Sequence, residues 1–134
     1  MISHNIGGEI MAKFIMFLIG SCGYGLIEVL WRGHTHWTMA IAGGLCALFI
    51  YVLNIEFNDM ALLYKCFAGA IIITSVELVT GIIVNLVLKW DVWDYSERAF
   101  NFLGQICPTY FVFWFLLCIP VVKLFDYFQN SLNL

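Results

Sequence analysis

A carboxylate in the middle of an apolar run is the residue of this chain best suited to chemistry. Glu77 follows three isoleucines and Thr74, and further apolar residues come after it. Inside a spanning helix a carboxylate costs about 2.5–3.5 kcal/mol on insertion scales, so it must face the bundle interior, where it is protonated, paired or hydrogen-bonded. It could bind a proton, a cation or a substrate there. Alternatively, it only joins helices through hydrogen bonds to Thr74, Thr80 or another helix.

Glu28 is a second carboxylate of this kind, nearer to the end of its apolar segment. Arg32 follows it at a spacing of four, which places both side chains on one face of a helix and favours a local ion pair. The alternative is a carboxylate pair with Glu77, in which the two groups share one proton. The sequence leaves both arrangements open.

Metal and catalytic chemistry are not indicated. His34 and His36 share a turn, but no His, Cys or Asp cluster completes a ligand set, so we expect no metal site. The five cysteines lie in or beside apolar segments without CxxC spacing, and we expect small buried hydrophobes. Nucleophile and metalloprotease motifs are missing, so we expect no enzymatic activity, no catalytic residue and no cofactor.

The charge pattern limits the partners. The net charge of −3 comes without any cluster of Lys and Arg, which argues against a nucleic-acid partner. The sequence also holds no Gly-rich loop that could bind phosphate. If ATP drives this protein, a separate ATPase subunit must therefore hydrolyse it.

The elements that carry these residues are predicted to be membrane-spanning helices. The chain is 63% hydrophobic and 11% charged, whereas about a quarter of the residues of a soluble domain are charged. A spanning helix needs about 20 mostly apolar residues, and open backbone is not tolerated in lipid. We therefore expect one all-α transmembrane domain over residues 1–134, with spans at about 11–31, 37–53, 60–88 and 105–125.

The connections between the spans differ in character. Residues 32–36 and 54–59 form short turns, whereas residues 89–104 mix aromatic and charged side chains and suit an interfacial or re-entrant segment. This topology places both termini and residues 54–59 at one membrane face. Each face receives three Lys or Arg residues, so the positive-inside rule does not decide the orientation; the short middle loop favours cytoplasmic termini. An aromatic belt is expected at the other face, from Trp31, Trp37, Trp90 and Trp93.

The two halves of the chain resemble each other. Each has a glutamate late in its first helix, an aromatic-hydroxyl pair in the turn and glycine at the start of the next helix. Two hairpins related by a pseudo-two-fold axis along the membrane normal would give this pattern, with Glu28 and Glu77 at matching depths. Chance similarity between two apolar hairpins gives it equally well.

Small and amide side chains are expected to serve helix packing. Asn85 and Gln105 favour hydrogen bonds between helices, and small residues at a spacing of four allow helices to approach closely. These pairs are Ser21 with Gly25, Ala40 with Gly44, and Cys66 with Ala70.

Four blocks of residues in the second half carry a family resemblance. They are Glu77-Leu78-Val79-Thr80-Gly81, Trp93-Asp94-Tyr95-Ser96, Phe100-Asn101 and Gly104-Gln105-Ile106-Cys107-Pro108, with Trp114 beyond. With them the chain resembles the CmpB-like family of type IV ABC-transporter permeases. Its first half departs from longer members, which carry a Gly-Pro turn and a Pro-Ile-Tyr-Gly motif where this chain has residues 31–39, so it resembles a short four-helix form.

The resemblance implies a small multi-pass permease-like subunit in the plasma membrane, of the bacterial inner-membrane type. Such a subunit would act as a homodimer or in a larger membrane complex, with a separate ATPase. The alternative is a non-transporting assembly partner or a holin-like oligomeric pore, in which the polar residues serve packing alone.

The resemblance also directs attention to the polar segment that follows Glu77. Asp94 or Ser96 could cap the start of a short helix, and Asn101 could satisfy open backbone where the chain re-enters. A ligand site and a well-formed re-entrant loop are compatible explanations. The candidate ion- or substrate-binding residues are Glu77, Glu28, Asp94, Tyr95, Ser96, Asn101, Trp93 and Arg32.

Overall fold

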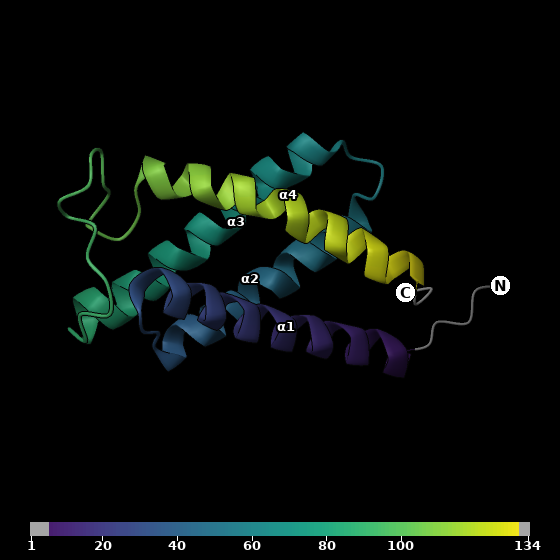
Figure 1. The fold of residues 1–134 in the computed structure, drawn as a ribbon, viewed down its shortest axis with the longest axis horizontal. Coiled ribbons are helices and arrows are strands. Elements are labelled where there is room, and N and C mark those ends of the chain that lie inside the picture. Colours follow the sequence, from purple (N-terminus) through teal and green to yellow (C-terminus); the bar gives the residue numbers. More distant parts are fainter. Residues whose placement is uncertain (1–5, 132–134) are drawn as a thin grey trace.

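The computed structural model describes residues 6–131, which form an all-helical bundle (Figure 1). Four of its helices are long and apolar enough to cross a membrane. This confirms the predicted all-α membrane fold. The third helix continues into a short π-helix, η1. The elements are α1 (Ile6–Arg32), α2 (Trp37–Glu56), α3 (Leu62–Gly81), η1 (Ile82–Val87) and α4 (Pro108–Ser131).

The helix limits differ from the predicted spans mainly at the first and fourth helices. α1 begins at Ile6, five residues before the predicted start, and Glu9 in its first turn suits the positive end of the helix dipole. α4 begins at Pro108 and not at 105, because proline favours the first helical position, where its missing N–H costs nothing. α4 also continues to Ser131. Its last turns are polar, so the apolar segment that defined the predicted span ends before the helix does.

The helices form two hairpins. α1 packs along α2, and α3 packs along α4, while α2 also contacts both α3 and α4. The α1–α2 turn and the segment 88–107 lie at the left end of Figure 1, and the α2–α3 connection lies at the other end, with the start of α1 and the end of α4. This is the arrangement of ends that the sequence predicts.

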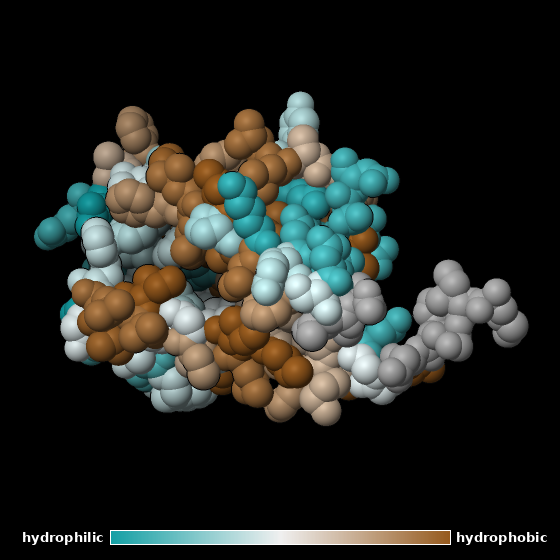
Figure 2. All heavy atoms as spheres, turned by 45° about the vertical axis from the view of Figure 1, so that its right-hand side comes forward, coloured by the Kyte–Doolittle hydropathy of each residue, from teal (hydrophilic) through white to brown (hydrophobic). Residues whose placement is uncertain are grey.

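The outer surface of the bundle is apolar. Figure 2 shows hydrophobic side chains gathered over the middle of the molecule and hydrophilic ones toward its ends. So many exposed apolar side chains suit a lipid environment and would favour aggregation in water. Large exposed apolar side chains come from every helix, among them Phe14, Leu18, Phe49, Ile71, Val79, Val112 and Leu116.

Small residues set the distance between α1 and α2. A Cβ atom added to Gly43 would lie 2.5 Å from the Tyr24 Cβ and 3.0 Å from the Gly20 carbonyl oxygen. The Ser21 hydroxyl donates a hydrogen bond of 2.7 Å to the Ala40 carbonyl oxygen. The close approach therefore depends on these small side chains.

The predicted small-residue pairs are confirmed except at one position. Ser21, Ala40 and Gly44 lie in the α1–α2 contact, and Cys66 and Ala70 are fully buried. A Cβ atom at Gly25, however, would meet nothing within 4 Å. Gly25 therefore does not pack against another helix of its own chain, and its alternative role, packing in a dimer, stays a prediction.

All four helices contribute to an apolar core, which lies toward the end of the bundle where α1 begins and α4 ends. Met16, Tyr51, Cys66, Cys118 and Phe125 are all nearly inaccessible there. A hydrogen bond of 2.6 Å between the Asn54 amide and the Asp126 carboxylate joins α2 to α4 beyond this core. Ile50 and Phe125 of this core also line a cavity that ends at Glu77.

The α1–α2 contact gives a first prediction. Gly43→Ala places a methyl group against Tyr24 and the Gly20 carbonyl, which should cost about 1–3 kcal/mol and lower the melting temperature by about 4 °C or more. Gly25→Ala is the matched control, since its methyl group meets open space and alanine favours the helix. Thermal unfolding of the purified protein in detergent measures both, and equal melting temperatures would contradict the described packing.

Candidate functional site

Glu77 lies inside the bundle, with only 6% of its surface exposed. The Tyr95 hydroxyl donates a hydrogen bond of 3.2 Å to its Oε2, and the Trp114 indole N–H donates one of 3.5 Å to its Oε1. The partners therefore come from the segment 88–107 and from α4. In the alternative packing role, Thr74 and Thr80 are not the partners, whereas another helix, α4, does supply a donor through Trp114.

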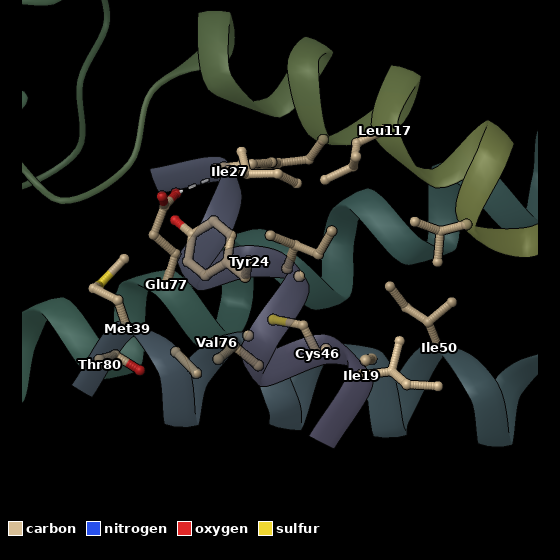
Figure 3. Close-up of a pocket in the computed structure, with 18 of the residues that line it drawn as sticks. Ile19, Tyr24, Ile27, Met39, Cys46, Ile50, Val76, Glu77, Thr80 and Leu117 are labelled. Carbon is tan, nitrogen blue, oxygen red and sulfur yellow. Dashed lines mark hydrogen bonds between the residues drawn. The ribbon is translucent and has the colours of Figure 1, made fainter. Parts of the chain in front are cut away.

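A cavity of about 230 Å³ lies beside Glu77, lined by all four helices. Figure 3 shows Glu77 at one end of this cavity with Tyr24 next to it, and Ile19 and Ile50 toward the other end. The walls are almost wholly apolar. Glu77 is thus the one acidic group among the cavity-lining residues, at the head of a long apolar space.

Glu28 is held by two partners near the end of α1. An ion pair of 3.3 Å joins its Oε2 to Arg32, as the spacing predicts, and the Tyr24 hydroxyl donates a hydrogen bond of 2.8 Å to its Oε1. Arg32 also donates to the Val92 carbonyl oxygen at 2.8 Å, which ties the end of α1 to the segment 88–107. Within the described chain no hydrogen bond joins Glu28 to Glu77.

The two carboxylates do not occupy matching positions. Glu28 lies one turn before the end of α1, whereas α3 continues past Glu77 through Gly81 and the six residues of η1. Their positions along the helices therefore do not follow the predicted repeat. The aromatic rings of Tyr24 and Trp114 lie between them, with centroids 6.0 Å apart in an edge-on arrangement.

Asn85 in η1 organises the segment that follows it. Its Oδ1 accepts hydrogen bonds from the backbone N–H groups of Val92 at 2.7 Å and Trp93 at 3.3 Å. Its Nδ2 donates to the Gln105 Oε1 at 2.7 Å. The predicted hydrogen bonds between helices are not formed by these two residues, because Gln105 lies in the non-helical segment 88–107 and Asn85 joins η1 to that segment. Since η1 is a π-helix, it is one of the local distortions that are frequent at functional sites.

Trp93 lies inside the protein, which corrects its predicted place in an exposed aromatic belt. Only 5% of its surface is exposed, and its indole N–H donates to the Gln105 carbonyl oxygen at 3.1 Å. Gly81 leaves room for it, because an added Cβ would lie 2.9 Å from the Trp93 ring. Trp31, Trp37 and Trp90 are exposed, and the ring centroids of Trp37 and Trp90 lie 5.9 Å apart.

Asp94, Ser96 and Asn101 form a turn and do not line the cavity. The Asp94 Oδ1 accepts from the Ser96 backbone N–H at 2.9 Å, and these hydrogen bonds with Ser96 hold the pKa of Asp94 below its ordinary value. Asn101 bonds the Ser96 and Arg98 carbonyl oxygens and the Gly104 N–H. The helix predicted to begin at Asp94 or Ser96 does not form, because the chain folds back through a 2.7 Å bond from the Tyr95 N–H to the Gly104 carbonyl.

Tyr95 is the residue of this turn that reaches the buried carboxylate. Its ring stacks on Tyr110 with centroids 4.7 Å apart and nearly parallel planes. Burial, followed by the nearby Glu77, raises the pKa of the Tyr95 phenol, so the hydroxyl keeps its proton and donates to Glu77. Tyr95 and Trp93 are therefore the predicted loop residues that the structure brings to the site.

Two residues of the site were not predicted from the sequence. Tyr24 lies four residues before Glu28, and this spacing could have identified it as a partner on the same helical face. Trp114 was known only as part of the family resemblance, and its contact with Glu77 spans 37 positions along the chain. No local pattern indicates such a contact.

Metal binding finds no support in the described part of the chain. Residues 6–131 contain no group of three or more His, Cys, Asp or Glu side chains that could hold an ion. His36 accepts a hydrogen bond from the Thr38 N–H at the start of α2, and its ring stacks on Trp37 at 5.6 Å. The histidine turn is thus a helix cap with aromatic packing.

Comparison with known proteins gives one match. The model of the family described as "Putative ABC-transporter type IV" matches residues 16–133, which is most of the chain and includes every residue of the site. No curated protein and no solved structure matches.

The hydrogen bonds of Asn85 give a second prediction. Asn85→Ala leaves two buried N–H groups and the Gln105 amide without their partner, which should cost about 2 kcal/mol or more. The segment 88–107 should then open more often, and trypsin should cleave after Lys89 and Arg98 at least about tenfold faster, since 1.4 kcal/mol is tenfold. Asn130→Ala, on the exposed end of α4, is the control. Unchanged cleavage in Asn85→Ala would show that this residue does not hold the segment.

Proposed function

We propose, from the premise that this chain belongs to the putative type IV ABC-transporter family, that it is a small transport subunit whose cavity beside Glu77 binds the transported species. The observation that carries the proposal is a buried carboxylate at the head of an apolar cavity between the helices. In this proposal the protein acts in transport and not as an enzyme.

The cavity favours binding over a packing role for Glu77. Protein interiors are close-packed, so a cavity beside a buried polar group is typical of a binding site. A carboxylate that served only to join helices would be stabilised best by short hydrogen bonds within a packed core. Here its two bonds are 3.2 and 3.5 Å long, and a cavity of about 230 Å³ lies beside it. Such an arrangement suits a site that receives a ligand.

The expected partners follow from the four helices that the structure describes. Four helices are few to enclose a path across a membrane, so a homodimer or a larger membrane complex would complete it. The chain contains no phosphate-binding loop, and a separate ATPase subunit would supply the energy if ATP is used. Four apolar helices place the protein in a membrane as a multi-pass protein, and we propose that this is the plasma membrane.

Replacement of Glu77 gives the third prediction. Strains of the host organism carrying the wild-type chain, a deletion, Glu77→Gln or Glu97→Gln are compared by mass spectrometry of small molecules in cells and medium. At least one species should differ severalfold in its distribution between wild type and deletion. Glu77→Gln should behave as the deletion, because it removes the charge that binds the ligand, and Glu97→Gln, an exposed carboxylate of the loop, should behave as wild type.

Two further measurements make the outcome decisive. Glu77→Gln should reach the membrane in wild-type amounts, because the amide oxygen can accept from Trp114 and the amide NH₂ can donate to the Tyr95 hydroxyl. Identical distributions in wild type and deletion, together with crosslinking of the chain into large ordered oligomers without a partner, would overturn the proposal in favour of a holin-like pore or assembly module. A wild-type distribution in Glu77→Gln would remove this residue from the transport site.

A further inference from the structure

The cavity opens toward the lipid between α1 and α4. These two helices belong to different hairpins and, among the described residues, share no interface comparable to those of α1 with α2 or α3 with α4. Ile27 of α1 and Leu124 of α4 line the cavity, and each is more than 40% exposed. Ile27 and Leu117 lie together along one side of the cavity in Figure 3. A ligand dissolved in the bilayer could therefore enter sideways.

The size and lining of the cavity require an apolar body. About 230 Å³ is the volume of roughly eight groups the size of a water molecule, at about 30 Å³ each, and an alkyl chain of about eight carbons would fill it. A polar molecule would lose its hydration without new hydrogen bonds, at a cost of about 1–3 kcal/mol for each polar group. The long apolar end of the cavity, away from Glu77, therefore favours a hydrocarbon chain over a polar molecule.

The charges at the head of the cavity require a cation. Glu77 lies on the cavity wall, and the nearby Glu28 is paired with Arg32. With both carboxylates ionised, Glu77, Glu28 and Arg32 together carry a net charge of −1. The Glu77 carboxylate has about four acceptor positions, and the bonds from Tyr95 and Trp114 occupy two of them. An ammonium group supplies both the positive charge and the missing donors.

Aromatic rings surround the same end of the cavity. Tyr24, Trp93 and Trp114 all line it. Faces of tyrosine and tryptophan attract cations by about 0.5–2 kcal/mol, most strongly where water is excluded. An anionic headgroup would instead face the Glu77 carboxylate, the one acidic side chain that lines the cavity. The surroundings of Glu77 therefore discriminate by the sign of the charge.

We propose that the cavity binds a lipophilic amine in its ammonium form, which enters from the bilayer between α1 and α4 and places its cation at Glu77. This inference rests on the proposed function, because it names the chemical class that the transport site would accept.

Photolabelling of the full chain in lipid nanodiscs tests this inference. The probes are three compounds of equal chain length that each carry a diazirine on the chain: an octylammonium, an octanoate and an octanol. The octylammonium should label cavity-lining residues at least tenfold more than the octanoate, and unlabelled octylammonium should compete it away saturably. Glu77→Gln should reduce that preference to less than twofold.

A pair of tryptophan substitutions tests whether the probes occupy the cavity. Leu117→Trp places a large ring on the cavity wall and should abolish labelling by all three probes. Leu116→Trp, one position away on the lipid-facing side of α4, should leave labelling unchanged. The inference is overturned if octylammonium and octanoate label the cavity equally, or if Leu117→Trp labels as Leu116→Trp does.

The two proposals fail in different ways. Absence of cavity labelling by octylammonium, with Glu77→Gln still behaving as the deletion in cells, overturns the ligand class and supports the transport site. Labelling that depends on Glu77, in a protein whose Glu77→Gln strain behaves as wild type, supports the ligand class and overturns its link to transport.

Discussion

The structure depends on keeping one carboxylate away from lipid. Glu77 can be buried in a spanning helix only if other elements supply donors, and those donors come from α4 and from the turn around Tyr95. The requirement therefore brings together three parts of the chain that share no local sequence relation. Tyr95 can reach Glu77 only because the segment 88–107 folds back toward the bundle, and Asn85 and Gln105 hold that segment in place.

The residues that carry the family resemblance are largely those that contact one another here. Gly81 makes room for Trp93 and Gln105, Glu77 accepts from Tyr95, and the Asn101 Oδ1 accepts from the Gly104 N–H. In contrast, α1 and α2 are joined through small residues such as Gly43 and Gly44. Two internally well-packed hairpins with little contact between α1 and α4 leave a space between them, and that space ends at Glu77.

Sequence patterns predict the features that depend on local spacing or hydropathy. The four spans and the Glu28–Arg32 ion pair are of this kind, because each depends on residues within one helix. The burial of Trp93 was not predicted, since interfacial tryptophans are common and only the fold shows that Gly81 leaves room for this one. The short helix expected at Asp94 is replaced by a turn, because a distant hydrogen bond from Tyr95 to Gly104 takes precedence over local capping. The cavity arises between hairpins and has no sequence pattern at all.

The most direct measurement is an experimental structure of the protein in a lipid bilayer, inspected around residue 77. The account predicts that the Glu77 side chain points into the bundle within hydrogen-bonding distance of Tyr95 and Trp114, beside an apolar space that opens between α1 and α4. A Glu77 side chain that points outward against acyl chains, or an interior in which α1 and α4 close together and fill that space, would contradict it.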